Sequence, residues 1–185
     1  HEYGRLVAML TRVAGVRHIE PVEDAVQTAL MTALTAWTNT GLPENPPAWL
    51  YRVAYNRLIG DLRRKADRLR ILERVADDVG PDDDQPVPPY FAGEVRDGVL
   101  RMLFVCCDDA IPRESRLVLA LKTLCGFSTA EIALRLFTTE ANAYKRLGRA
   151  RGRLRATPPE LQTPPLEELR SRLSSVHDVL YLLFN

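Results

Sequence analysis

Residues 113–155 constrain the fold more than any other part of the chain, because helical segments alternate there with two short turns. Ser128 and Glu131 stand three positions apart, the capping-box spacing in which each side chain satisfies a free backbone N–H at the start of a helix. This helix is expected to end at Thr138, a suitable N-cap for the next helix, with Glu140 in its first turn. Two helices joined by so short a turn predict a helix-turn-helix.

The second of these helices, residues 140–155, is expected to have one apolar and one basic face. Its apolar residues recur with helical spacing, and they are Ala143, Leu147, Ala150 and Leu154. Residues 141–155 contain six Lys or Arg and no Asp or Glu. Such cations neutralise phosphates, and Arg or Asn can also pair with base edges. The cap, the turn and the basic face together favour DNA binding over the alternative, a solvated basic helix on an ordinary bundle.

The net charge of +1 conceals a strong segregation of charge along the chain. Residues 52–70 hold seven basic and two acidic residues, whereas residues 73–97 hold eight acidic and two basic ones. Together with the basic helix described above, the order is basic, acidic, basic. A protein that binds nucleic acid through two basic segments, with an acidic segment between them, would have this order of charges.

Nearly every other segment also has a helical pattern, so the sequence predicts an all-α fold. A first helix is expected to end near Gly15, and a second to begin at Pro21. The buried side of the second helix is expected to hold Val26, Leu30, Ala33, Leu34 and Trp37. Asn45 is expected to cap a third helix that has Pro46 at its first position. The expected organisation is two small helical domains (1–70 and 94–156), a flexible acidic, Pro-rich linker (71–93), and a Pro-rich break followed by a C-terminal helix (157–185).

Other function classes are disfavoured by what the sequence lacks. No apolar run approaches the length of a membrane span, and no signal peptide is visible. Cys106, Cys107 and Cys125 form neither a disulfide framework nor a zinc pattern, so buried thiols in a reducing cytoplasm are expected. There is no Gly-rich phosphate loop and the three histidines are scattered, so we predict no enzyme, no cofactor and no metal. The chain lacks an initiator Met and is expected to be part of a longer protein.

The third expected helix gathers polar and aromatic residues on the face opposite its apolar stripe. These residues are Trp49, Arg52, Asn56, Gly60 and Arg63. An aromatic ring with an amide and arginines beside it suits unstacked single-stranded bases better than duplex. The alternative is a Trp that closes a small core, with the charges kept for solubility, and the sequence leaves both open.

Three motifs in this order resemble those of bacterial RNA polymerase sigma factors of the extracytoplasmic-function group. Residues 23–29 resemble the segment of region 2 that docks on the clamp helices of the polymerase β′ subunit. Residues 47–56, with Asp61 and Arg63, resemble the helix that opens the −10 element. Residues 127–155 resemble region 4, which reads the −35 element. The resemblance covers about residues 1–155.

The resemblance implies a promoter-specificity factor whose partners are core polymerase (β′ clamp helices and β flap), promoter DNA, and an anti-sigma factor or its own C-terminal extension. It places Asp24, Gln27 and Leu30 on the polymerase face. It places Trp49, Arg52, Asn56 and Arg63 at the −10 element. The residues expected at the −35 element are Asn142, Tyr144, Lys145, Arg146, Arg149 and Arg151, with Lys145 and Arg149 as the main contacts.

Two segments, residues 101–107 and 179–185, resemble a subgroup of these factors that has a long helical C-terminal extension. In that subgroup a His-Pro pair commonly follows the two cysteines, whereas Asp108 and Asp109 stand here, which weakens any case for metal binding. We expect residues 166–185 to dock onto the second domain or onto such an extension. By resemblance, the extension would take the place of a separate anti-sigma factor.

The length of the linker agrees with this reading. Residues 71–92 are 22 residues, which reach roughly 70 Å when fully extended. Two promoter elements about 17 base pairs apart are separated by roughly 58 Å at about 3.4 Å per pair. The main rival is a conventional helix-turn-helix regulator with a separate helical sensor or dimerisation domain. It would explain the second domain but not the motifs around Asp24 and Trp49.

Overall fold

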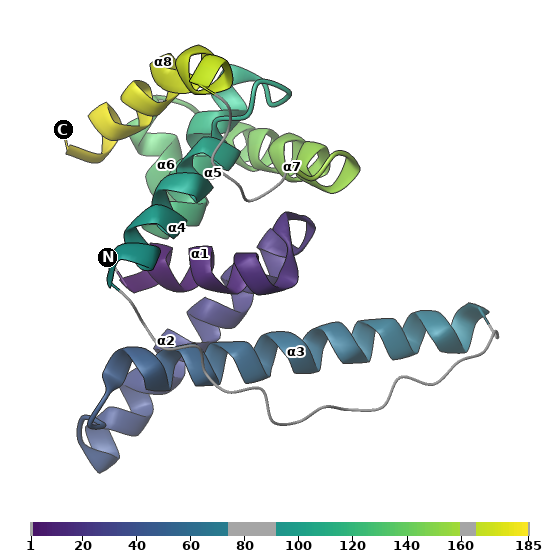
Figure 1. Cartoon of the computed structure of the whole chain (residues 1–185), viewed down its shortest axis with the longest axis vertical. Helices are drawn as coiled ribbons and strands as arrows, with labels where there is room; N and C mark the ends of the chain where they lie inside the picture. Colours follow the sequence, from purple (N-terminus) through teal and green to yellow (C-terminus); the bar gives the residue numbers. More distant parts are fainter. Residues whose placement is uncertain (1, 74–91, 160–165, 185) are drawn as a thin grey trace. The chain divides into compact units, whose positions relative to one another are not determined.

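The computed structural model describes residues 2–73, 92–159 and 166–184, and these residues form helices and no strand. The all-α expectation is therefore confirmed (Figure 1). The elements are α1 (Glu2–Ala14), the 3₁₀ turn η1 (Val16–His18), α2 (Ile19–Thr40), α3 (Pro46–Glu73), α4 (Ala92–Cys106), α5 (Arg113–Cys125), α6 (Thr129–Arg135), α7 (Glu140–Ala156) and α8 (Leu166–Phe184). No helix of the described part is long and apolar enough to cross a membrane.

The chain divides into two compact units. Unit 1 joins His1–Glu23 to Phe91–Asn185, and unit 2 is Asp24–Tyr90. The division falls inside α2, so the packing units differ from the sequence domains 1–70 and 94–156, which stay predictions. Most of the predicted acidic linker, residues 74–91, lies outside the described residues.

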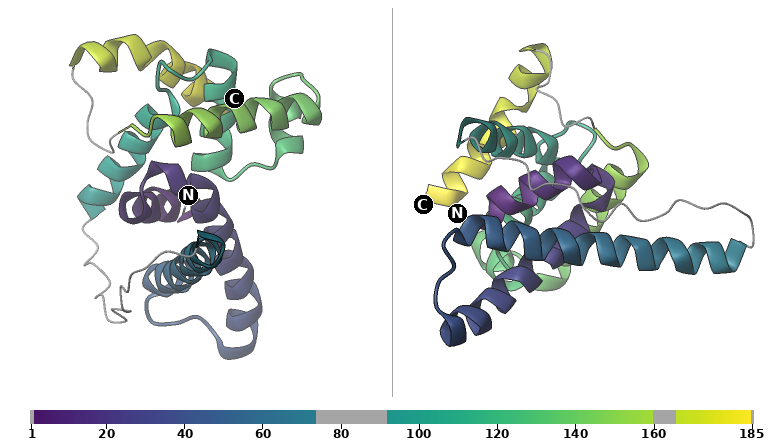
Figure 2. Two further views of the ribbon diagram at one scale, coloured as in Figure 1. Left: turned by 90° about the vertical axis from the view of Figure 1, so that its right-hand side faces the viewer. Right: turned by 60° about the horizontal axis from the view of Figure 1, so that its bottom comes forward.

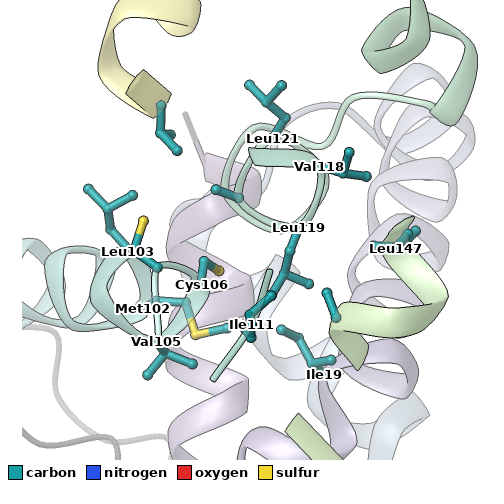
Figure 3. Packing of buried hydrophobic residues seen from close by; sticks show 14 of the residues in the cluster. Ile19, Met102, Leu103, Val105, Cys106, Ile111, Val118, Leu119, Leu121 and Leu147 are labelled. Carbon is teal, nitrogen blue, oxygen red and sulfur yellow. The ribbon is translucent and has the colours of Figure 1, made fainter. Parts of the chain in front are cut away.

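Unit 1 is built around a cluster of buried apolar side chains from α4, α5 and α7 (Figure 3). Ile19, at the start of α2, belongs to the same cluster as Leu119 and Leu147. Helix α1 packs against α4 and α5, and it approaches α5 so closely that a Cβ at Gly4 would lie 2.4 Å from the carbonyl oxygen of Leu124. The N-terminal helix is therefore part of the core of unit 1.

The helix-turn-helix has the predicted capping box. Ser128 accepts from the backbone N–H of Glu131 at 3.2 Å, and the Glu131 carboxylate accepts from the N–H of Ser128 at 2.8 Å. The N-cap of α7 is Thr139 and not Thr138, which corrects the sequence expectation. The reason is that the N–H of Thr138 still bonds back to Ala133 at the end of α6, so the chain becomes extended one residue later. Thr139 then accepts from the N–H of Asn142 at 3.3 Å.

Unit 2 contains α3 and the part of α2 that follows Glu23. The side chain of Asn45 accepts from the N–H of Ala48 at 3.2 Å, and α3 begins at Pro46, so the predicted cap is confirmed. Trp37 of α2 packs edge-on against Trp49 of α3, with ring centroids 5.5 Å apart. The second half of α3 extends past α2 (Figure 2).

Helix α8 docks within unit 1, on α5 and α4, as the sequence predicts. Val176 and Val179 are buried in the interface. Arg172, which is largely buried, pairs with Asp108 at 2.9 Å, and Ser171 donates to Asp109 at 2.7 Å. The two aspartates that depart from the subgroup pattern thus anchor α8 to the end of α4.

Candidate nucleic-acid interface

Helix α7 presents its polar face to solvent because its apolar face is buried. Ala143, Leu147, Ala150 and Leu154 are all buried in the unit 1 cluster, as their helical spacing predicts. The Thr139 cap and the short turn from α6 fix where α7 begins. The basic side chains between these buried positions decide what α7 can bind.

Four of the six predicted −35 residues are exposed, and they are Asn142, Tyr144, Lys145 and Arg149. Lys145 and Arg149 make no ion pair with any residue that the structure describes. Their cationic groups are therefore available to phosphates or base edges. Tyr144 adds a ring that is 68% exposed, next to these donors in the sequence.

The other two predicted −35 residues are committed to carboxylates of unit 1. The guanidinium of Arg146 pairs with Glu114 of α5 at 2.6 Å, and its side chain is 17% exposed. Arg151 pairs with Glu20 at 2.8 Å and also with Glu23. In this conformation α7 therefore has a free basic face and a face held by acidic residues.

Glu23 is the most deeply buried acidic residue of this arrangement, at 1% exposed. Its carboxylate accepts from the hydroxyl of Thr123 at 2.6 Å and from Arg151. Burial raises the pKa of Glu23, and the charge of Arg151 partly opposes that rise. Sequence reasoning missed Glu20 and Glu23 as partners of α7, because no local signal relates residues about 130 positions apart.

The predicted −10 residues of α3 are placed differently. Arg52, Asn56 and Arg63 are exposed, whereas Trp49 is half-buried against Trp37. Trp49 therefore helps to close the small core between α2 and α3, which was the alternative that the sequence left open. Whether its remaining surface also stacks on bases stays a prediction.

The predicted polymerase face lies on α2. Asp24 and Gln27 are exposed, and Leu30 is half-buried. Leu34 was expected on the buried side but is 69% exposed, whereas Trp37, three residues further along α2, is half-buried. Met31 is 66% exposed as well. Asp24, Gln27, Met31 and Leu34 follow one another at helical spacing, so the face combines polar and large apolar side chains.

The cysteines are buried thiols, as the sequence predicts. Cys106 and Cys107 are buried and Cys125 is half-buried, and all three are free. Burial raises the pKa of Cys107 to about 12 and that of Cys125 to about 11. Within the described residues, no group of three or more His, Cys, Asp or Glu side chains could hold a metal ion.

The capped turn and the exposed basic face of α7 define a helix-turn-helix of the DNA-binding class. Residues 1–68 match the family Sigma-70 region 2, and residues 101–154 match the family Sigma-70, region 4. The chain therefore belongs to the sigma-70 family, in the extracytoplasmic-function type that these two regions indicate.

The chain is 32% identical over 170 residues to the uncharacterized protein R00370 of Rhizobium meliloti (strain 1021). The match covers 91% of this chain but 40% of that relative. No solved structure matches the chain.

Proposed function

We propose that the chain binds core RNA polymerase and directs promoter-specific initiation, reading −10 with α3 and −35 with α7. The observation that carries this proposal is the exposed, unpaired basic face of α7 on a capped helix-turn-helix. The two sigma-70 regions support it, because they are the regions with which sigma factors take part in promoter recognition. Such a factor acts where polymerase is, in the cytoplasm.

At the −35 element, Lys145 and Arg149 are the main contacts in this proposal, and Asn142 and Tyr144 flank them. All four are exposed on α7. Arginine pairs bidentately with guanine and asparagine with adenine, so Arg149 and Asn142 can discriminate bases. Arg146 and Arg151 can contribute only after they release their carboxylates.

At the −10 element, the exposed side chains of Arg52, Asn56 and Arg63 would hold melted bases and backbone. Trp49 supplies the aromatic surface on which a base can stack, from a position fixed by Trp37. An amide beside a ring and cations suits unpaired bases, whose edges are accessible.

The polymerase would bind the face of α2 that contains Asp24, Gln27 and the half-buried Leu30. Met31 and Leu34 extend this face with exposed apolar surface. Large apolar side chains gathered on one exposed face mark an interaction surface.

We infer that the chain belongs to the subgroup with a helical C-terminal extension, and that α8 is its first helix. The docking of α8 through Arg172 and Asp108 supports this inference. In that subgroup the extension would regulate activity in place of an anti-sigma factor. Deleting residues 158–185 should then change transcription while the helix-turn-helix still binds −35 duplex.

In-vitro transcription with purified core polymerase on candidate promoters tests the main proposal. A sigma factor gives specific transcripts only when core and chain are combined. A conventional helix-turn-helix regulator would protect duplex DNA without core and would yield no transcript with it. The double variant Asp24→Ala/Gln27→Ala supplies the matched control, because it should lose transcription while binding of −35 duplex is retained.

A further inference from the structure

We propose that Phe137, in the turn between α6 and α7, contacts the 5-methyl group of a thymine in the −35 duplex and helps to determine which sequence is bound. The inference rests on the proposed function, and it adds a residue that the sequence pattern did not single out for this element. It is argued from the backbone conformation of Phe137, the exposure of its ring and its position before α7.

The turn closes α6 with a Schellman motif, and Phe137 occupies the left-handed position of that motif. The N–H of Phe137 donates to the carbonyl of Leu134 at 3.3 Å, and the N–H of Thr138 donates to the carbonyl of Ala133 at 2.9 Å. The residue at the left-handed position is usually Gly and sometimes Asn. Phe137 has a φ of 48°, and no other non-Gly residue of the described ranges has a positive φ. A bulky side chain at such a φ is strained, whereas Gly is not.

The ring of Phe137 gives the fold nothing in return for this strain. It is 99% exposed, so it buries no apolar surface within unit 1. The apolar contact that often accompanies a Schellman motif involves the residue after the left-handed one, and not the left-handed residue itself. Strained residues persist mainly at functional sites. A partner that covers this ring would gain the free energy of removing apolar surface from water.

Phe137 lies next to the part of α7 that is expected to meet base edges. It precedes the N-cap of α7, Thr139, by two residues. The side-chain amide of Asn142 donates to the hydroxyl of Thr138 at 3.3 Å, so a proposed base-reading residue contacts the immediate neighbour of Phe137. In a docked helix-turn-helix, the N-terminal residues of the second helix contact the bases. The partner that covers the start of α7 in the proposed function is therefore duplex DNA.

The chemistry of the major groove determines what a phenyl ring can recognise there. Every base pair presents hydrogen-bond donors and acceptors, but the 5-methyl group of thymine is the apolar group that the groove offers. The phenyl ring neither donates a conventional hydrogen bond nor neutralises a phosphate. Lys145 and Arg149 can make those polar contacts from the exposed face of α7. A thymine methyl is thus the ligand that matches Phe137.

Replacing thymine by deoxyuridine tests the contact from the side of the DNA, because only the methyl group is removed. The probe is the −35 duplex that the full chain selects from a randomised pool, with deoxyuridine placed at one thymine position at a time. Fluorescence anisotropy measures the affinity, with and without core polymerase. We expect one position at which binding weakens about three- to fourfold, the scale of one methyl-sized apolar group. A selected duplex without thymine, or one in which no position responds, would overturn the proposal.

The variant Phe137→Gly assigns the methyl contact to this ring. Gly adopts the left-handed conformation without strain, so the variant should fold and its thermal midpoint should not fall. It should bind the thymine and deoxyuridine duplexes equally, about three- to fourfold more weakly than the wild-type protein binds the thymine duplex. Phe137→Leu keeps an apolar side chain and should retain part of the discrimination. If Phe137→Gly still prefers thymine as strongly as the wild-type protein does, another residue contacts the methyl group and the proposal is wrong.

Leu134→Ala is the matched control, because Leu134 is another exposed apolar side chain, at 78%, near the end of α6. This variant should discriminate thymine from deoxyuridine as the wild-type protein does, and a loss of discrimination here would also contradict the assignment to Phe137. Transcription assays separate this result from the proposed function. A chain that discriminates the methyl group but yields no transcript with core polymerase keeps the contact and refutes the sigma activity. Transcription without methyl discrimination refutes the contact alone, and failure to bind any duplex in either condition refutes both.

Discussion

Helices α3 and α7 are both basic and are both proposed to bind nucleic acid, but they hold their cations in different ways. On α3, Arg57 and Arg64 pair with Asp61 of the same helix, and all three are well exposed. On α7, Arg146 and Arg151 pair with carboxylates of α5 and α2, and both guanidiniums are largely buried. Although the two helices have similar compositions, the ion pairs of α3 lie within the helix, whereas those of α7 join it to other helices.

This difference in ion pairing determines which charged side chains can easily exchange one partner for another. An exposed pair one turn apart contributes little to stability and is screened by salt. Removing one member of a pair whose carboxylate is buried costs much more stability, because the other member is left uncompensated. The binding proposed for α7 would thus be coupled to the packing of unit 1, whereas the binding proposed for α3 would not be coupled through its ion pairs.

The largest effect is expected for Glu23→Ala. The substitution leaves Arg151 without its buried partner and removes the acceptor for Thr123, so the free energy of unfolding should fall by about 3 kcal/mol or more. Denaturant unfolding followed by circular dichroism measures the loss. Asp61→Ala on α3 is the matched control, and it should cost at most about 1 kcal/mol because its pairs are exposed. Equal losses in the free energy of unfolding for the two variants would contradict the proposed difference between the ion pairs of α7 and those of α3.

Arg149→Ala should act on DNA rather than on stability, because Arg149 is exposed and outside every ion pair of the described residues. We expect −35 binding to weaken by about 1–3 kcal/mol, with relaxed specificity at one base position. Fluorescence anisotropy on a panel of single-base variants of the −35 duplex measures both. Arg153→Ala, which removes another exposed cation of α7, is the control. A uniform loss for every sequence would mean that Arg149 contacts only phosphate.

Asn56→Ala tests the exposed face of α3 and should have a smaller effect. Loss of one amide that binds unpaired bases should reduce promoter opening by about 1 kcal/mol, the scale of one hydrogen bond. Core binding should be unchanged, because Asn56 lies on α3 while the proposed polymerase face lies on α2. Permanganate reactivity of melted thymines reports the opening. Normal melting with Asn56→Ala would remove this residue from the −10 site.

The local features of the fold could be predicted from the sequence. The capping box at Ser128, the Asn45 cap and the buried stripe of α7 depend on residues three or four positions apart, so the pattern contains the whole interaction. The one-residue shift of the cap to Thr139 arose because α6 ends with an extra backbone bond from Thr138. That bond has no side-chain signature.

The tertiary features could not be predicted in the same way. Nothing near Arg151 distinguishes it from Arg149, yet one is held by Glu23 and the other is free. The helical spacing of α2 placed Leu34 on the buried side, but a helix face is buried only where another element covers it. Residue spacing predicts which side of a single helix is apolar. It does not predict which side chains of two different helices pair, because that depends on the fold.

The smallest effect concerns the capping box, a local pair inside the helix-turn-helix itself. The N–H and hydroxyl of Ser128 donate to the carboxylate of Glu131 and lower its pKa below the usual range. A carboxylate with a lowered pKa contributes stability that is present above its unfolded pKa and is lost as pH falls through its folded pKa. Acidification below the usual range of glutamate should therefore loosen the first turn of α6.

Hydrogen exchange of the amides of Ser128 and Glu131, measured against pH and corrected for the intrinsic rate, follows this loosening. In Glu131→Gln the group cannot ionise, so protection at these amides should be weaker at neutral pH and should not change through the acidic range. The Glu23–Arg151 pair is the internal comparison, because burial moves the pKa of Glu23 upward and not downward. An acid-induced loss at α6 that persists in Glu131→Gln would show that the charges of the tertiary contacts, and not the local cap, set the pH response of the helix-turn-helix.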